Sequence, residues 1–460
     1  MDVPLTYLPI GILGAFRWLS WMFRRMVASR YTIFEGAVPE TTLSVVTPVY
    51  QEDPRTFIKA LKSWLANPTV NEVICVIDVT DLVCWQIANS LSAVDSRIQL
   101  VSTDVPGKRD ALRKGWEHAT GKIVALVDSD TIWANDVGAE VLKPFADRRI
   151  GAVATRQSVF EPSSVWEYLT DFYLDYRYFD EVAAQTAWGR AISCVSGRTA
   201  VYRRWVLLDI SEEFMAETFW GVPCNSGDDK RLTTLALERG HRTYLQRSAR
   251  VWSTFPSDYR VFMKQRLRWA RNTWRSDLRA LMNGWVFRHR FLAFVLIDKA
   301  ISPFTTLLAP VFFLIAVIRA DYLVVGVILV WWLVSRGIKN WAHLRENPGA
   351  VLLLPAFVLV SFLMAGIRIQ ALLTIRTQRW LTRDVAVVDG ELMRTAEEEL
   401  GDIDLVLSNP SPTSKPIAKP PAISKPPELS AVSGPTAPTK VRIPVAKTPR
   451  SDPMVVEMKK

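Results

Sequence analysis

Asp128 and Asp130 are the residues whose types and spacing first suggest chemistry. They follow Ile123–Val127, a continuous apolar run typical of a strand that is buried on both faces. Open α/β sheets bind ligands at the carboxyl ends of their strands, so both carboxylates would lie where a substrate binds. Two such acids can hold a hard divalent cation, Mg²⁺ or Mn²⁺, that bridges phosphate oxygens. For this motif taken alone, the alternative is a solvated turn.

The segment around these acids alternates strand-like and helix-like patterns, which predicts an α/β, doubly wound sheet. The expected strands are Leu43–Thr47, Val73–Asp78, Ile98–Ser102 and Ile123–Val127, and the expected helices are Arg55–Leu65, Leu82–Leu91 and Lys108–Ala119. The sequence has no Gly-x-Gly-x-x-Gly after the first strand and no Walker loop, which disfavours a dinucleotide fold and a P-loop.

Each of these strands leads into a side chain that suits a nucleotide sugar. The first runs into Pro48, Tyr50 and Glu52, and the second ends in Asp78. Lys108 opens a predicted helix, whose N-terminus favours anions. A ring for a base, acids for ribose, and a lysine with a cation for a pyrophosphate together predict a nucleotide-sugar site. Taken singly, Tyr50 and Asp78 are more often structural.

Composition favours a membrane-bound protein. Hydrophobic residues make up 49% of the 460 positions and are unevenly placed, and the net charge is +10. That charge suits an anionic membrane surface or a polyphosphate ligand. Nucleic acid is disfavoured because the sequence has no zinc-finger spacing, RNP-type motif or basic-region heptads. The four cysteines form no close pair and no metal-ligand pattern, which predicts reduced thiols.

Three apolar segments predict contact with a lipid bilayer. Leu5–Phe23 is broken only by Arg17 and is followed by further arginines, so we expect a transmembrane helix that leaves the next segment in the cytosol. An interfacial helix is the alternative. Pro303–Ile318 and Tyr322–Val334 predict a transmembrane hairpin with a tight outer turn. Asp258–Arg290 mixes basic residues with tryptophans, which predicts amphipathic interface helices, with a solvated basic helix as the alternative.

A set of short motifs resembles the membrane-embedded processive glycosyltransferases of family 2, which include hyaluronan, cellulose and chitin synthases. The matching segments are VVTPVYQED, the Asp78 strand, PGKRDAL, VDSDT, CVSGRTAVYRR, SGDDKRLT and QRLRW. The Gly-Asp-Asp form looks more like hyaluronan synthase than like cellulose synthase. The resemblance runs from about Ser44 to Arg383 and implies a glycosyltransferase-A-like fold that uses UDP-sugar donors.

The resemblance also implies a role for each matching residue. Asp229 matches the family's catalytic base, which must lie within hydrogen-bond reach of the acceptor hydroxyl. The alternative for Asp228 and Asp229 is an acidic pair at a helix N-terminus. Arg268 would stabilise the departing UDP together with the cation on Asp128 and Asp130.

The acceptor side would be formed by Ser196, Gly197, Asp228, Gln265 and Trp269. Trp269 offers a flat apolar face for the terminal sugar of the growing polysaccharide, although a tryptophan in a helix is more often part of a core. One position departs from the family, because hyaluronan synthases usually carry Ser-Gly-Pro where this chain has Arg198 in third place. That arginine predicts either an acidic polymer or a side chain that points outward.

The segment Trp380–Arg383 resembles the family's Trp-Gly-Thr-Arg gating element, which implies donor contacts for Trp380, Thr382 and Arg383, although Leu381 replaces the glycine. Since that element closes from the cytosol, we expect Ala350–Ile375 to form an interfacial or re-entrant pair of helices, with a full span as the alternative.

The expected organisation has five parts. They are an N-terminal transmembrane helix in 1–30, a cytosolic catalytic domain in 40–255, interface helices with QRLRW in 256–300, a transmembrane hairpin with interface helices and the gating element in 301–385, and a disordered Pro/Lys-rich cytosolic tail in 386–460. The tail holds 12 of the 27 prolines.

The predicted function is processive, inverting polymerisation of sugars at the plasma membrane. The competing interpretations are a cellulose- or glucan-type synthase, a non-processive transferase to a lipid acceptor, and a nucleotide-binding scaffold without activity. The sequence leaves open the identity of the sugars and whether a homo-oligomer or an accessory export partner completes the channel.

Overall fold

The computed structural model describes residues 12–377, 385–388 and 391–394. The chain divides into two compact units, Met1–Leu400 and Gly401–Lys460. The second unit, which includes most of the predicted tail, lies outside the described residues. The same holds for the gating residues Trp380, Thr382 and Arg383.

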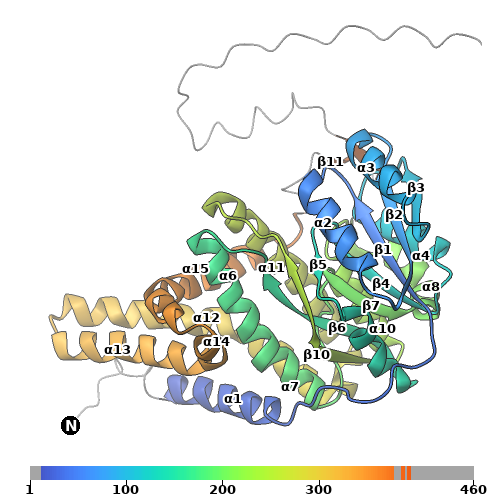
Figure 1. Ribbon diagram of the computed structural model, residues 1–460. Coiled ribbons are helices and arrows are strands. Elements are labelled where there is room, and N and C mark those ends of the chain that lie inside the picture. Colours follow the sequence, from blue (N-terminus) through green and yellow to red (C-terminus); the bar gives the residue numbers. More distant parts are fainter. Residues whose placement is uncertain (1–11, 378–384, 389–390, 395–460) are drawn as a thin grey trace, which may run out of the picture. The chain divides into compact units, whose positions relative to one another are not determined.

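A mixed eight-stranded sheet forms the core of the first unit, in the order β3-β2-β1-β4-β7-β6-β10-β5 (Figure 1). The strands are β1 Leu43–Val49, β2 Val70–Asp78, β3 Ile98–Thr103, β4 Ile123–Val127, β5 Ile132–Trp133, β6 Ile150–Val159, β7 Thr199–Arg203 and β10 Arg242–Ser253. The run from β3 to β4 is parallel, whereas β7 is antiparallel to both of its neighbours. The doubly wound mixed sheet predicted from the sequence is therefore confirmed.

The predicted strands and helices of the first half are confirmed to within three residues. The helices are α2 Pro54–Leu65, α3 Leu82–Ser92 and α4 Lys108–His118. Every residue of β1 and β4 is buried, as expected for central parallel strands. Asp53 and Asp81 cap α2 and α3 by accepting hydrogen bonds from backbone amides.

Pro48 lies within β1, although we predicted that it would lie in the turn after this strand. It pairs in register with Val76 of β2, but the ladder with β4 ends at Val46. A proline cannot donate to a ladder, so it is tolerated where a strand has already lost one neighbour.

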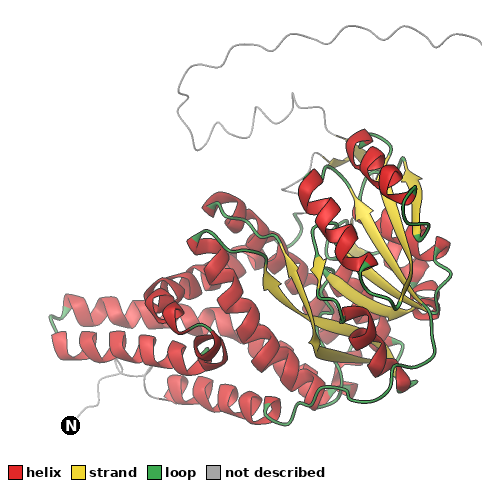
Figure 2. Ribbon diagram, viewed as in Figure 1, coloured by secondary structure: helices red, strands yellow, loops and turns green. Residues whose placement is uncertain are grey.

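Further helices cover the second half of the sheet (Figure 2). They are α5 Val137–Leu142, α6 Val165–Tyr176, α7 Val182–Ala187, α8 Arg204–Asp209, α9 Ser211–Met215 and α10 Asp228–Glu238, with a π-helical turn at Arg177–Glu181 between α6 and α7. A two-stranded hairpin, β8 Thr218–Phe219 and β9 Val222–Pro223, precedes α10. The turn at Gly227 has a left-handed φ of 86°, which glycine adopts without strain.

The remaining helices precede or follow the sheet in the sequence, and of these α12, α13 and α15 are largely apolar whereas α11 is rich in arginine. They are α1 Ile12–Ala28, α11 Tyr259–Met282, α12 Arg290–Ile318, α13 Tyr322–Lys339, α14 Trp341–Glu346 and α15 Leu354–Leu373. Among the described residues, the segments of α12, of α13 and of Pro348–Leu373 are long and apolar enough to cross a membrane. The predicted hairpin is confirmed as two helices, because α12 and α13 pack together and are joined by residues 319–321.

The segment 350–375 differs from the expected pair of helices. A short 3₁₀ turn, Pro348–Leu353, leads into the single helix α15. Phe357 near its start packs on Phe172 of α6 at 4.8 Å between ring centroids, and Thr374 just after its end accepts a hydrogen bond from Arg271 of α11 at 3.0 Å. Pro355 falls in the first turn of α15, where a proline is tolerated, and therefore does not split the segment.

Ordered backbone extends past residue 386, where we expected the disordered tail to begin. Val385–Val388 and Glu391–Arg394 pair as the antiparallel strands β11 and β12. The sequence between them is Asp389-Gly390, a dipeptide typical of tight hairpins, so a sequence signal for this hairpin existed.

Polar contacts fasten α1 to α12. Arg17 and Arg24 both form ion pairs with Asp298, and Ser20 donates a hydrogen bond to the same carboxylate at 3.0 Å. Arg24 and Asp298 are buried. Residues 1–11 lie outside the described part of the chain, so the expected span Leu5–Phe23 stays a prediction.

Candidate active site

Three elements bring charged side chains together at the carboxyl ends of the parallel strands. Lys108 opens α4, Asp128 follows β4, and Asp228 begins α10. The Lys108 ammonium lies 2.5 Å from an Asp128 carboxylate oxygen and 3.0 Å from one of Asp228. Burial opposes the charge of Lys108, but the two carboxylates raise its pKa above the ordinary lysine value. The structure brings these three residues together, so that one lysine pairs with two acids, and their roles stay predictions.

The turn after β4 is fixed from both sides. Ser129 donates a hydrogen bond to Glu52 at 2.7 Å, which links this turn to the end of β1. Asp130 accepts a hydrogen bond from Thr254, just after β10, at 2.6 Å. Burial raises the pKa of Asp130, Arg198 opposes the rise, and the negative charge of Asp128 adds to it.

The pair Asp128 and Asp130 fits a divalent cation. A cation between them would relieve both the desolvation and the mutual repulsion that raise the pKa of Asp130. Hard cations prefer carboxylate oxygens, which both residues supply. Both aspartates stay the predicted metal-holding residues.

Asp229 lies one residue further into the first turn of α10. One carboxylate oxygen accepts hydrogen bonds from the Cys194 thiol and the Gly197 amide, each at 3.4 Å. The other accepts from the Lys230 amide at 2.8 Å. Asp229 is also among the residues around a small cavity, together with Lys108, Gly197, Asp228 and four apolar residues. Asp229 is therefore at a helix N-terminus, as the alternative interpretation required, and its role as the base stays a prediction.

Gly197 is a position where a side chain would not fit easily. A Cβ atom there would lie 3.2 Å from the Lys108 amine and 3.5 Å from the Cβ of Asp229. The absent side chain leaves the pocket open beside both residues. This geometry supports the predicted place of Gly197 at the acceptor, while Ser196 precedes it in the same loop before β7.

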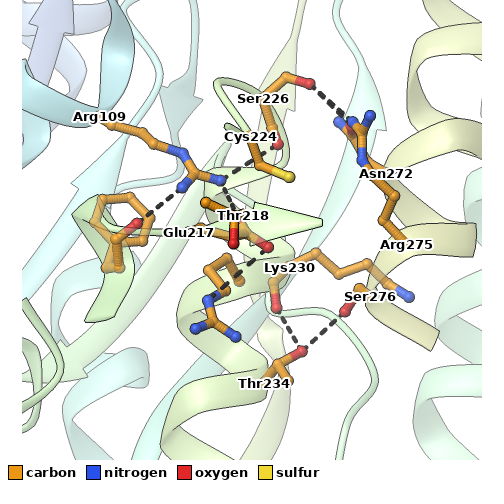
Figure 3. Close-up of polar contacts among 12 residues, drawn as sticks. Arg109, Glu217, Thr218, Cys224, Ser226, Lys230, Thr234, Asn272, Arg275 and Ser276 are labelled. Carbon is orange, nitrogen blue, oxygen red and sulfur yellow. Dashed lines mark hydrogen bonds and ion pairs between the residues drawn. The ribbon is translucent and has the colours of Figure 1, made fainter. Parts of the chain in front are cut away.

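A buried arginine that the sequence analysis overlooked holds the segment before α10 (Figure 3). Arg109 forms an ion pair with Glu217, and both side chains are 7% exposed. It also donates to the carbonyl oxygens of Phe214 at 2.8 Å and Ser226 at 3.4 Å. Arg109 follows Lys108 directly in the sequence. The start of α4 therefore places Lys108 beside Asp128 and Asp228, and through Arg109 it also binds the loop that leads to Asp228.

Contacts between α10 and α11 complete this support (Figure 3). The Ser226 hydroxyl donates to the Asn272 side chain at 2.9 Å. Thr234 lies 3.0 Å from the Ser276 hydroxyl and donates to the Lys230 carbonyl at 2.8 Å. The acids at the start of α10 are therefore held by the helix that carries the QRLRW motif.

That motif lies on α11 and presents the expected acceptor residues. Trp269 is half-buried and packs against the main core, and a side-chain oxygen of Gln265 is buried without a hydrogen-bond partner among the described residues. Arg268 is half-buried on the same helix. Arg198 does not point outward, because its guanidinium lies 3.9 Å from the centroid of the Phe255 ring and 5.6 Å from that of Trp269.

The other predicted donor residues lie at the same edge of the sheet. Asp78 ends β2, is buried, and accepts hydrogen bonds from the amide and hydroxyl of Thr80 at 3.0 and 2.6 Å. Tyr50 follows β1 and is half-buried. Their contacts with a nucleotide stay predictions.

A second group of acids with a histidine has side chains that could bind a metal, but one of its acids is already paired with an arginine. Asp171, Asp175 and His343 lie close together where α14 meets α6. Arg156 donates to one oxygen of Asp175 at 3.0 Å, and the His343 ring lies 2.8 Å from the other. We interpret this group as a structural link between α6 and α14.

Comparison with known proteins identifies the family. The family described as "Glycosyltransferase like family 2" matches residues 39–272, just over half of the chain. The chain belongs to the family 2 glycosyltransferases. Hyaluronan synthase from Streptococcus pyogenes is 26% identical over 387 residues, which make up 81% of this glycosyltransferase and 91% of that protein. An N-acetylglucosaminyltransferase from Mesorhizobium japonicum is 32% identical over 251 residues, or 53% of this chain and 58% of that protein.

A solved structure supports the fold of this glycosyltransferase. The mannosyltransferase from Pyrobaculum calidifontis, in complex with GDP-Man and Mn²⁺, is similar with a TM-score of 0.54 at 20% identity. The match covers 82% of this chain and all of that one. The glycosyltransferase-A-like mixed sheet is thereby confirmed.

Sequence reasoning missed three residues around the pocket of the glycosyltransferase. Arg109 and Cys194 lie inside quoted motifs, yet neither was given a role. Arg266 lies inside QRLRW and is 8% exposed. A charged residue inside an otherwise apolar helix face was the signal that could have marked Arg266 as buried.

Proposed function

We propose that this glycosyltransferase extends a polysaccharide from UDP-activated sugars, with inversion at the anomeric carbon, and passes the chain across the membrane. The observation that carries the proposal is the cluster of Lys108, Asp128, Asp228 and Asp229 at the carboxyl edge of the sheet, where Lys108 pairs with two of the acids. The relationship to hyaluronan synthase over most of both chains supports a polymerising reaction.

In the proposed reaction, the acceptor hydroxyl attacks the anomeric carbon of the donor. A new carbon–oxygen bond forms as the bond to UDP breaks, and one displacement inverts the configuration. Asp229 takes the acceptor proton, since its carboxylate lies beside this charged cluster and accepts hydrogen bonds from Cys194 and Gly197 without a lysine or arginine bonded to it among the described contacts. UDP leaves as the second product.

Charge on the departing diphosphate requires positive groups near the turn after β4. Lys108 is held there by Asp128 and Asp228, and Arg268 is the candidate from α11. Mg²⁺ or Mn²⁺ bound by Asp128 and Asp130 would supply Lewis-acid stabilisation of the same charge. We assign Tyr50, Glu52 and Asp78 to the nucleoside end of the donor.

The helices suggest how the product leaves. The apolar hairpin of α12 and α13 follows α11, which carries Trp269, so the proposed acceptor platform and the proposed spans are adjacent in the chain. We place α15 in the membrane interface, because its start packs on α6 and its end bonds to α11. That arrangement keeps both ends of α15 on the side of the catalytic sheet, which we propose to be cytosolic.

The test uses the full chain in lipid nanodiscs with Mn²⁺. UDP release is measured with UDP-glucose, UDP-N-acetylglucosamine and UDP-glucuronate, singly and in pairs, with GDP-mannose as a control donor. Product size is then read by gel electrophoresis, and linkage by digestion with specific hydrolases. A long product made only from UDP-sugars is expected. One added sugar would exclude polymerisation, and no UDP release with any donor would contradict the proposal.

A further inference from the structure

One buried arginine lies between the loop that leads to the proposed base and the end of α15. Arg275, on α11, is 3% exposed. Through one terminal nitrogen it donates to the carbonyl oxygens of Ile375 at 3.3 Å and Thr377 at 3.4 Å, which follow α15. Through the other it donates to the Ser226 hydroxyl at 3.3 Å and to the side-chain oxygen of Asn272. One guanidinium thus binds two segments that are far apart in the chain.

The loop side of this contact leads directly to the acids of the site (Figure 3). The Ser226 hydroxyl donates to the same Asn272 oxygen at 2.9 Å. Gly227 follows with a left-handed φ, and a Cβ atom there would lie 3.0 Å from the Asn272 side chain. Asp228 and Asp229 are the next two residues and begin α10. The start of α10 is therefore packed against α11 through Ser226 and Gly227.

Arginine suits this position because of the shape of its side chain. The guanidinium carries five N–H donors in a rigid plane, so it can donate to oxygen atoms on two sides at once. A lysine ammonium is a compact charge on a flexible stem and would lose this two-sided geometry. The described hydrogen bonds of Arg275 go to carbonyl, hydroxyl and amide oxygens on both sides. The side chain therefore sets the distance between the loop before α10 and the end of α15.

A second arginine on α11 provides a matched comparison. Arg271 lies one turn before Arg275 and is 8% exposed. It donates to the Thr374 hydroxyl at 3.0 Å, and the described hydrogen bonds give it no contact with the loop 224–227. Both arginines bind the end of α15, but of the two only Arg275 also binds the loop before α10.

We propose that Arg275 is a positioning residue for sugar transfer, which fixes the turn that carries Asp229 relative to α15 and so keeps the proposed base within reach of the acceptor hydroxyl. This inference rests on the proposed function, since it assigns a supporting residue to the same site. Arg275 makes no hydrogen bond to Asp229 among the described contacts, so it acts through Ser226 and Gly227. A displacement of about 1 Å at a reacting group can cost about a hundredfold in rate. Loss of Arg275 should therefore slow the transfer step more than it weakens donor binding.

Four variants of the full chain in nanodiscs test the inference. They are Arg275→Lys, Ser226→Ala, the double variant with both changes, and Arg271→Lys as the matched control. The values of kcat and donor KM are measured by UDP release with the donor pair that reacts fastest in the assay described above, at saturating Mn²⁺. The dissociation constant of UDP and the melting temperature are measured on the same preparations. UDP binding shows that a variant is folded, and the melting temperature reports the loss of contacts with α15.

We expect Arg275→Lys to lower kcat by at least about tenfold, while donor KM and the dissociation constant of UDP change by less than about threefold. Arg271→Lys should lower the melting temperature by a similar amount, since it also weakens the end of α15, but it should keep kcat within about twofold of the wild type. Ser226→Ala keeps the contacts of Arg275 with α15 and should lower kcat by about threefold. The double variant should lose no more than Arg275→Lys alone, because both changes remove the same link.

An unchanged kcat in Arg275→Lys, or equal losses of kcat in Arg275→Lys and Arg271→Lys, would overturn the inference. A higher donor KM at unchanged kcat would overturn it as well, and so would kcat losses that multiply in the double variant. If Arg275→Lys does not bind UDP, Ser226→Ala decides, and full kcat in that variant overturns the inference. With any of these outcomes in a wild type that releases UDP, the proposed function stands. If the wild type releases no UDP with any donor, the proposed function itself fails.

Discussion

Two charged regions lie near the proposed site, and their charges are balanced in different ways. On the sheet side, Lys108 is shared by Asp128 and Asp228, so carboxylates outnumber cations. On the helix side, Arg198 and Arg266 lie near the Trp269 ring and form no carboxylate ion pair among the described contacts, although the charge of Arg198 opposes the rise in the pKa of Asp130. The two sides are therefore coupled through Asp130.

The difference lies in how many of the charges are paired within the protein. Arg156 and Asp175 form a direct ion pair. Asp128 and Asp228 share one cation, and Arg198 acts on Asp130 without a direct ion pair among the described contacts. Predictions that change one side and leave the other unchanged test how strongly the two are coupled.

The largest effect is expected from Asp229→Asn. The amide cannot take the acceptor proton, so transfer should fall by about a thousandfold while the shape of the pocket is kept. UDP release and polymer length measure the loss. Asp209→Asn, which removes a half-exposed acid paired with Arg239, is the control and should keep full activity. Full transferase activity in Asp229→Asn would show that another group is the base.

A matched pair of arginine substitutions compares paired and unpaired buried charge. Arg109→Met removes one of two arginines bonded to the buried Glu217, leaving Arg279, and also removes the donor to the Phe214 carbonyl, so it should cost about 3 kcal/mol of unfolding free energy. Arg266→Met strands no carboxylate, so its unfolding free energy should change by no more than about 2 kcal/mol, the size of the lost ring contacts. Chemical denaturation of both variants in the same detergent measures the difference. Equal losses would mean that Arg266 has an internal counterion.

Asp180 is a buried acid that belongs to neither side of the pocket. Its side chain is 2% exposed, both oxygens lack hydrogen-bond partners among the described residues, and burial raises its pKa to about 6. In the unfolded chain the pKa of Asp180 is about 4. The folded state therefore holds the proton more tightly, so the free energy of unfolding should fall as the pH rises from about 4 to about 6.

Asp180→Asn removes that ionisation. The variant should be more stable than the wild type by about 3 kcal/mol above pH 7, and the advantage should disappear below pH 4. Melting temperatures recorded across this range test the expectation. An advantage that is the same at every pH would show that the charge of Asp180 is balanced by Arg24, Arg25 or Lys339.

The smallest expected change is on the metal side. Asp128→Asn should lower transfer by about a hundredfold and weaken the response to added Mn²⁺, since one of the two cation ligands loses its charge. Asp136→Asn, which alters an exposed acid that makes no cap hydrogen bond, is the control. A titration of activity with Mn²⁺ after chelation separates weaker metal binding from slower chemistry, and an unchanged Mn²⁺ requirement in Asp128→Asn would remove this residue from the metal site.

The sequence predicted one side of the pocket far better than the other. Ile123–Val127 is β4 residue for residue, because an apolar run that ends in acids has one clear interpretation. The meeting of Lys108 with Asp128 followed from motifs near the ends of parallel strands, whereas Asp228 was placed at the site only by the family resemblance. Arg198 was left with two alternatives, because its surroundings come from Phe255 and Trp269, which are distant in the chain and fixed only by tertiary packing.

The helices show the same division between local and tertiary information. The end of α12 and the start of α13 were predicted by the short break between two apolar runs, but α12 begins at Arg290, before the predicted Pro303, and α13 ends at Lys339, beyond the predicted Val334. The segment around Pro355 was expected to form two helices, yet it forms one, because position in the first turn decides what a proline does to a helix. Local composition limits the structures that a segment can form, and packing against neighbouring elements determines which of them it adopts.

The ion pairs between α1 and Asp298 bear on the order in which the protein is made. Arg24 leaves the ribosome 274 residues before Asp298, and the whole catalytic sheet is synthesised in between. Two arginines on an apolar helix are poorly tolerated in lipid until their carboxylate arrives. We therefore expect α1 to bind the bilayer surface weakly during translation and to pack against α12 only after α12 has been synthesised. The attachment of α1 is then a late step in the assembly of the protein.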